Sequence, residues 1–416
     1  MNLGIRGIQG GFTTGSPNLH EFSTVPTIKG DYNVWEAFSE LNMPLWAASD
    51  GKRRLEMDVA ARFSDYSTSG GITSWKGGLN FQATQFLRLR TTVSRDVREP
   101  TFAERFDVQG GGGSVSEKAI NGVPNPAGVA TTFQITSVNV GNPDLVPEEA
   151  DTVTAGIVVQ PGDTGLQFSV DWYDIDLAGA IGQLGVQGIL NECIATSGAS
   201  PLCANVIRDP LTGAVTTVYN PYLNINSAEV RGYDYELLWN KQTHFFANKS
   251  ESLTLRFLAG NLLEDSTTTP SGTKTDSAGQ LAEAHWRGLV GVRYQVASFG
   301  VSLQERYIGS SGINPQPGAI TYLQFSPGLV PGATQQTVDD ATVDPKRYTD
   351  LTFTYDHGTA SGKSWEISLA ITNVMNEDPP IIPVFDQRFS AQSNPIGFNT
   401  YDVYGRRYLL NFTYKL

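Results

Sequence analysis

Apolar and polar side chains alternate with a period of two residues over many short stretches of the chain. The clearest stretch is the last one, residues 401–416, where one register is apolar and the other is largely polar. A period of two places alternate side chains on opposite faces of a β-strand. This stretch therefore predicts a strand whose apolar face carries Tyr408, Leu410, Phe412, Tyr414 and Leu416.

The same alternation recurs upstream and predicts about 13 or 14 strands in all. Their connections are short and long in turn from residue 44 to the C-terminus, and only the link at 67–71 is short where a long one is due. Tight turns at one end and long loops at the other are typical of outer-membrane β-barrels, whereas sandwiches and propellers mix their loop lengths. The pattern predicts an all-β fold, an antiparallel transmembrane β-barrel with short periplasmic turns and long extracellular loops.

The apolar face of the terminal strand bears on the same question. An apolar edge strand in water can pair with other chains and aggregate. In a barrel, the apolar face would meet lipid and the polar face would meet an aqueous lumen. A half-buried strand of a soluble β-sandwich alternates in the same way, so this stretch alone does not decide between the two.

The segments between strands give further predictions. Pro44 and the Ser-Asp-Gly run at 49–51 predict a turn, and residues 96–149 and 179–217 predict long irregular loops. The glycine run 110–113 lies inside the first of these loops and does not join a strand to a helix. It therefore indicates a flexible backbone rather than a phosphate-binding loop.

Composition agrees with a barrel but does not require one. Hydrophobic residues make up 40% of the 416 residues and the mean hydropathy is −0.21. The longest apolar runs are only a few residues, far below the roughly 20 that a membrane-spanning helix needs. A barrel gives such averages because half of each strand faces water. The net charge of −13 argues against a nucleic-acid partner.

The two cysteines, Cys193 and Cys203, lie in a segment rich in Gly, Ser, Ala and Pro. With no histidine nearby they make a poor zinc site. We expect a disulfide that restrains a loop in an oxidising compartment, and two unpaired loop cysteines are the alternative.

Catalytic chemistry finds little support in the sequence. The histidines are scattered along the chain, and neither His-Glu-x-x-His nor Gly-x-Ser-x-Gly occurs. We therefore expect no enzyme activity, no catalytic or metal-ligating residues and no cofactor. The histidines are His20, His244, His285 and His357.

Arg88 and Arg90 are the strongest candidates for binding residues. They share the polar register of one predicted strand, so a barrel would direct both side chains into its lumen. There they could contact a plug inside the barrel or an anionic solute, or they could pair with Glu56 and Asp58 on the polar face of a nearby strand. The charge pattern favours the structural pairing.

Several segments carry sequence motifs in a fixed order. Residues 98–104 read Arg-Glu-Pro-Thr-Phe-Ala-Glu, and residues 141–148 read Gly-Asn-Pro-Asp-Leu-Val-Pro-Glu. Residues 229–236 read Glu-Val-Arg-Gly-Tyr-Asp-Tyr-Glu. The pieces Asn373-Val-Met-Asn376 and Tyr404-Gly-Arg406 precede the terminal strand.

This ordered set resembles the TonB-dependent receptors of the Gram-negative outer membrane and covers most of residues 89–416. The resemblance implies a receptor in the cell outer membrane, surrounded by outer-membrane lipid, that takes up a scarce solute such as a siderophore, cobalamin or a glycan. It also implies that the ligand binds at extracellular loops and that the energy comes from the inner membrane through TonB.

The sequence also departs from that family. It ends on Leu416, where the family usually ends on an aromatic residue, and it has too few strands for a barrel of about 22. Neither a plug domain nor the short segment that contacts TonB is found. We therefore expect residues 1–416 to be the C-terminal part of the barrel domain, with TonB contacted through the missing plug. The terminal strand should then lack its natural partner.

Two other functions stay open at this point. One is a passive barrel or adhesin whose loops bind a ligand, and the other is a secreted β-sandwich that binds carbohydrate. The identity of the solute is not readable from the sequence, because loops decide it.

Overall fold

The computed structural model places most of the strands and leaves gaps mainly in the connections. The described residues are 3–6, 31–49, 51–117, 119–120, 123–124, 131–246, 249–268, 274–281, 283–312, 322–323, 336–337, 342–358, 364–380 and 400–415. Leu416 lies outside them, as does His20.

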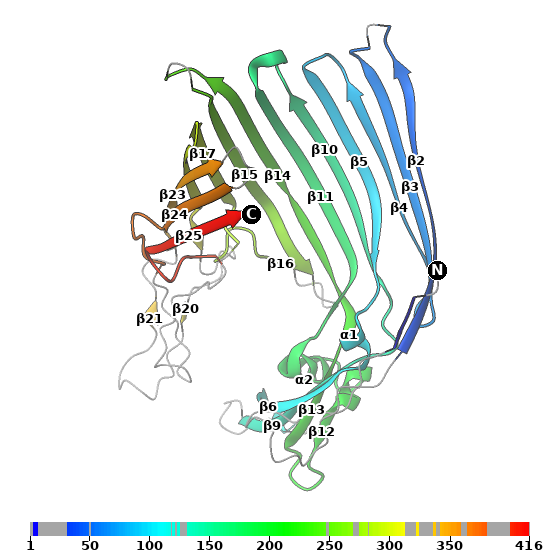
Figure 1. Ribbon diagram of the computed structural model, residues 1–416. Helices are drawn as coiled ribbons and strands as arrows, with labels where there is room; N and C mark the ends of the chain where they lie inside the picture. The colour runs from blue at the N-terminus through cyan, green and yellow to red at the C-terminus, as the bar shows by residue number, and fades with distance from the viewer. Residues whose placement is uncertain are drawn as a thin grey trace.

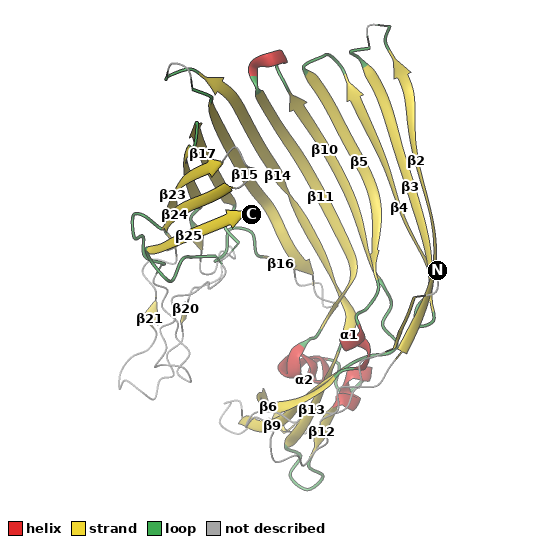
Figure 2. Ribbon diagram, viewed as in Figure 1, coloured by secondary structure: helices red, strands yellow, loops and turns green. Residues whose placement is uncertain are grey.

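One large antiparallel sheet dominates the described residues (Figures 1 and 2). It has 15 strands, and all but the short β16 (Lys274–Asp276) follow one another in chain order. The strands in this order are β1 (Leu3–Arg6), β2 (Asp31–Ala47), β3 (Arg54–Tyr66), β4 (Gly70–Gln82), β5 (Leu87–Arg98), β10 (Glu148–Val159), β11 (Leu166–Gly182), β14 (Leu223–Thr243), β15 (Glu251–Thr268), β17 (Trp286–Val296), β18 (Phe299–Ile308), β23 (Lys346–Gly358), β24 (Ser364–Thr372) and β25 (Arg407–Lys415).

The prediction of antiparallel strands joined by short and long connections in turn is confirmed. In Figure 1 the short turns from β2 to β15 lie at the upper end of the wall, and the long connections lie at the lower end. We call these ends the turn end and the loop end. A single continuous sheet also does not fit the two packed sheets of a β-sandwich.

The turn expected at Pro44 is wrong, because β2 continues to Ala47. Its pairing with β3 shifts register between Pro44 and Trp46. Proline has no N–H to donate to a sheet. The bulge beside Pro44 allows the strand to continue. The chain turns only after this bulge. The turn expected at residues 49–51 is correct, since the Gly51 amide donates to the Ala48 carbonyl at 3.0 Å.

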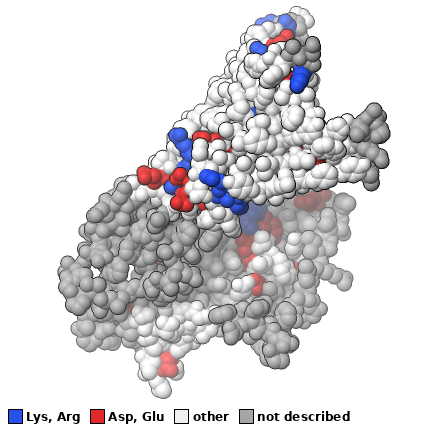
Figure 3. Space-filling view, turned by 60° about the vertical axis from the view of Figure 1, so that its left-hand side comes forward, with Lys and Arg blue, Asp and Glu red and all other residues white. Residues whose placement is uncertain are grey.

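Strand register gives the sheet one largely apolar face, which we call the outer face, and an opposite inner face. On β25 the outer face carries Tyr408, Leu410, Phe412 and Tyr414. In the same order, these residues lie opposite four residues of β24, which are Ile371, Leu369, Ile367 and Trp365. Leu410 is 72% exposed and Phe412 is 64% exposed. Figure 3 shows a stretch of mostly uncharged surface that lies between charged residues at the top of the view and a band of charged residues below it.

The sheet does not close on itself within the described residues. The edge strand β1 pairs with β2, and the edge strand β25 pairs with β24. Among the described residues, no strand pairs with the edge of β25 that faces away from β24, as expected for the terminal strand. Of the helices that the structure describes, none has the length and hydrophobicity needed to cross a membrane.

The two long segments predicted to be irregular instead fold together at the loop end. Strands β6 (Val108–Glu117), β9 (Thr131–Val140), β12 (Val206–Arg208) and β13 (Val215–Pro221) form a four-stranded sheet in the order β12-β13-β9-β6. We call this sheet, with α2 (Gly185–Ala195) and the 3-10 helix η2 (Pro201–Asn205), the loop domain.

The loop domain has its own hydrophobic core, which both segments supply. Buried residues of this core are Val115, Ile135, Ile189, Leu190, Val215 and Val218. The flexible-backbone prediction for the glycine run 110–113 is therefore wrong, because these glycines lie in β6 and pair with β9. Backbone pairing in a sheet needs no side chains, so glycines can be held in place by their neighbours.

The remaining elements are short. They are α1 (Phe102–Phe106), the 3-10 helix η1 (Gly162–Thr164), and the two-residue strands β7 (Ala119–Ile120), β8 (Val123–Pro124), β19 (Ser311–Gly312), β20 (Tyr322–Leu323), β21 (Gln336–Thr337) and β22 (Thr342–Val343).

A disulfide joins Cys193 of α2 to Cys203 of η2, with 5.1 Å between the two Cα atoms. We expect replacement of both cysteines by serine to lower the stability of the loop domain by about 2–3 kcal/mol, because the unfolded segment gains conformational freedom. Hydrogen exchange should quicken in α2 and stay unchanged in β11, which belongs to the main sheet. Equal acceleration in both elements would contradict this prediction.

Candidate functional site on the inner face

Two of the motifs meet where the first long segment leaves the main sheet and returns to it. Thr101 caps α1, and its hydroxyl and the Glu104 carboxylate form a reciprocal capping box. Arg98 at the end of β5 contacts Glu104 at 3.0 Å and Glu148, the first residue of β10, at 2.5 Å. Burial raises the pKa of Glu104, but hydrogen bonds from Arg98 and Thr101 outweigh it and hold that pKa below its ordinary value.

The buried side chain of Arg105 also connects the same two motifs. It is 2% exposed and lies 2.8 Å from the Glu99 carboxylate. It also donates to the Pro143 carbonyl at 2.6 Å and to the Ser69 hydroxyl. We call Arg98, Glu99, Glu104, Arg105 and Glu148 the rim clasp. The clasp fixes both ends of the segment 99–147 and so positions half of the loop domain.

The other motifs also have structural roles. Gly232 lies where the β14–β15 pairing shifts register, and a Cβ there would lie 2.5 Å from the Tyr173 hydroxyl. Near the start of β25, the Asn376 side chain accepts a hydrogen bond from the Arg406 amide at 3.0 Å. Gly405, with φ of 68°, adopts the left-handed backbone that this contact requires.

Arg90 is held on the inner face, but not by the predicted partners. Its guanidinium makes a bidentate ion pair with Asp171 on β11, with Nε–Oδ1 and Nη2–Oδ2 distances of 2.7 and 2.5 Å. Gly156 of β10 stands between them, opposite both residues. Since Gly156 has no side chain, the pair spans β10. Glu56 instead contacts Arg54 at 3.2 Å.

Gly156 is therefore required for this ion pair. A Cβ at this position would overlap Asp171 Oδ1 and lie 3.1 Å from Arg90 Cγ. We expect Gly156→Ala to separate the pair at a cost of less than about 1 kcal/mol, because both side chains are partly exposed. Reaction of Arg90 with phenylglyoxal should become faster, as peptide mass spectrometry can measure. Gly77→Ala, which has open space around its Cβ, is the control, and an equal effect of both substitutions would contradict the assignment.

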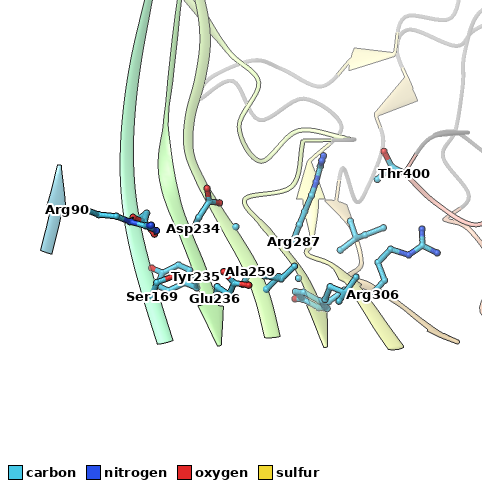
Figure 4. Close-up of a pocket in the computed structure, with 16 residues that line it drawn as sticks. Arg90, Ser169, Asp234, Tyr235, Glu236, Ala259, Arg287, Arg306 and Thr400 are labelled. Atoms are coloured by element: carbon cyan, nitrogen blue, oxygen red, sulfur yellow. The ribbon is translucent and has the colours of Figure 1, made fainter. Parts of the chain in front are cut away.

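A cavity of about 730 Å³ lies on the inner face beside this ion pair (Figure 4). Its charged lining comes from five strands, β5, β11, β14, β17 and β18. These residues are Arg90, Asp171, Asp234, Glu236, Arg287 and Arg306. Arg88 is not among the lining residues, and its Nε is buried without a hydrogen-bond partner among the described residues.

The charges of the cavity are arranged in two groups. Figure 4 shows Arg90 and Asp234 toward one side and Arg287 and Arg306 toward the other. Glu236 contacts Arg256 at 3.6 Å, and Arg287 contacts Glu283 at 3.1 Å. The surface can therefore bind polar groups of both signs. The sequence had indicated Arg90, but strands distant in sequence supply the other lining residues.

Metal and catalytic groups are sparse in the part of the chain that the structure describes. Among the described residues, one group of carboxylates could hold a metal ion, because its oxygen atoms lie within 4.8 Å of one another. It consists of Asp174, Asp176 and Glu229. They lie on the outer face, and Glu229 already contacts Lys274 at 3.1 Å. The described histidines belong to separate places, after β14, before β17 and in β23.

Comparison with known proteins gives one family and a set of similar folds. The family model described as TonB dependent receptor-like, beta-barrel matches residues 5–374. The comparison with curated proteins finds no match.

Among solved structures, the siderophore receptor PirA from Acinetobacter baumannii is similar with a TM-score of 0.56 and 14% identity, over 92% of this chain and 45% of that chain. A mutant of the ferric enterobactin receptor PfeA from Pseudomonas aeruginosa, in complex with enterobactin, has a TM-score of 0.59 and 12% identity, over 99% of this chain and 50% of that chain. At these identities the likeness shows the fold. The chain spans half or less of the length of these receptors.

Proposed function

Since this chain belongs to the TonB-dependent receptor β-barrel family, we propose that it forms barrel wall of an outer-membrane receptor that takes up a scarce solute. Siderophores, cobalamin and glycans are the solute classes that we consider. The receptor lies in the outer membrane of a Gram-negative bacterium, with the loop end outside the cell and the turn end in the periplasm. The family and its structural neighbours are receptors and transporters, which supports a function other than catalysis.

The observation that carries this proposal is the difference between the two faces of one continuous sheet. Its outer face is apolar over the terminal strands, and its inner face holds a charged cavity of about 730 Å³. The apolar outer face is stable in contact with lipid, and the charged inner face is stable in contact with water. A wall of this kind separates lipid from a polar path.

Energy coupling is the part of the proposal that depends most on the family. We propose that TonB supplies the energy through a plug domain outside residues 1–416, which we assign to the C-terminal part of the barrel domain. We also propose that extracellular loops, including the loop domain, contact the solute first. The rim clasp supports this role because it fixes the loop domain to the wall.

Uptake by living cells tests the proposal. The complete gene product would be expressed in a Gram-negative host without its own receptors, in paired strains with and without TonB. We expect labelled ferric siderophore, cobalamin or oligosaccharide to enter only when both the receptor and TonB are present. Equal uptake in both strains would favour a passive barrel, and surface binding without uptake would favour an adhesin.

A further inference from the structure

We propose that Arg306 is an anion-binding residue of the inner-face cavity, and that the solute carries a carboxylate or phosphate group which it binds. This inference rests on the proposed function, since it names the class of solute that the receptor takes. Arg306 comes from β18 and lines the cavity at the side that also holds Arg287.

The surroundings of Arg306 hold its guanidinium in place. The Arg306 Cζ atom lies 5.2 Å from the centroid of the Tyr348 ring, in a cation–π arrangement. Tyr348 has no exposed surface and packs with Ile308, Val343 and Tyr401. A guanidinium that is already positioned on a rigid base loses little conformational entropy when it binds an anion.

The two other arginines that line the cavity, and Arg256 of the neighbouring strand β15, already have carboxylate partners. Arg90 pairs with Asp171, Arg256 with Glu236, and Arg287 with Glu283. Arg306 is half-buried, and no carboxylate lies within 4.0 Å of it among the described residues.

A half-buried cation without a counter-ion has lost hydration and gained no ion pair in return. An oxyanion would restore that interaction through charge-assisted hydrogen bonds to the guanidinium. The planar fork of arginine suits carboxylate and phosphate oxygens in particular.

The cavity sets a further condition on the solute. Its volume of about 730 Å³ is within the ordinary range for small-molecule sites, roughly 300–1,000 Å³. Asp234 lines the other side and is exposed. Its carboxylate would repel a second anionic group, so the solute should carry its acidic group at one end and neutral or cationic groups at the other.

The same oxyanion chemistry could come from an acidic side chain elsewhere in the receptor. The cavity is open on the inner face and has the size of a small molecule, so we assign the anion to a free solute. The experiment separates the two sources.

Phenylglyoxal modification of the complete receptor in detergent tests the assignment without measuring transport. We expect Arg306 to react when no anion is added, and millimolar citrate to slow its modification about tenfold, as one charged hydrogen-bonding group would. An equal concentration of glucose should leave the rate unchanged. Reaction at the paired Arg256 is the internal control and should change little with either additive.

Two results would overturn the proposal. Arg306 could react at the same rate with and without citrate, which would mean that it binds no anion. It could instead be inert before any addition, which would mean that the receptor itself covers it with its own acidic group.

Substitutions provide a second, independent measurement. Calorimetry should show citrate bound about tenfold more weakly by Arg306→Gln than by the unmodified receptor. Arg256→Gln, the matched control on β15, should stay within about twofold. Equal weakening in both variants would also reject the role of Arg306. Since neither measurement involves transport, failure here leaves the uptake test undecided, and failure of uptake leaves these results standing.

Discussion

Replacement of Glu99 by alanine is expected to cost about 3–5 kcal/mol of the free energy that docks segment 99–147 onto the main sheet. The substitution leaves the buried guanidinium of Arg105, which is 2% exposed, without its anionic partner. It also removes the acceptor of the Thr68 and Ser69 hydroxyls, which lie 2.9 and 2.8 Å from the Glu99 carboxylate. The rim clasp should open, and the loop domain should lose its attachment at this end.

Limited proteolysis and hydrogen exchange measure this effect. Amides of α1 and β6 should exchange faster, whereas those of β3 and β4 should keep their protection. Asp151→Ala is the matched control, because Asp151 and its ion-pair partner Arg95 are 53% and 40% exposed, and an ion pair open to water contributes little to stability. If the two substitutions had equal effects, the rim clasp would not be the attachment point.

The second large effect is expected on the outer face of the terminal strand. Phe412→Arg should destabilise the folded protein in a bilayer by about 2–4 kcal/mol if position 412 lies near the midplane, because lipid must accept a charge. Phe412 is 64% exposed and stands opposite Ile367, on the apolar face.

Thr413→Arg is the control for this prediction, because Thr413 lies on the inner face of the same strand. Denaturant unfolding in lipid vesicles would compare the two variants. Single cysteines provide a second test, since a water-soluble reagent should label positions 411 and 413 faster than positions 408 and 412. Equal destabilisation and equal labelling would place water on both faces of β25.

The wall could be predicted from the sequence because its signal is local. In a strand with one face toward lipid and the other toward water, apolar and polar side chains alternate every two residues. This alternation can be recognised without knowing the rest of the chain. Leu55, Met57 and Val59 illustrate the point, since their alternation predicted a strand and the register of β3 places them on one face. The lengths of the connections then fixed which ends of the strands lie together.

The motifs were recognisable in the sequence, but their partners were not. The segments 98–104 and 141–148 were identified separately, and only the folded chain shows that Arg98 and Arg105 join them. Likewise Arg90 was expected to pair with Glu56 or Asp58, which are near in sequence. Its real partner is Asp171, reached across Gly156.

By itself, the sequence determined the type of fold, the positions of most strands and which residues share a face, because these follow from short repeats. The tertiary structure decided the loop domain, in which β13 pairs in parallel with β9 from a segment far away in the chain. It also decided which strands supply the cavity. Both depend on contacts between distant segments, and such contacts are set by strand register and by packing around a shared core, which no local pattern contains.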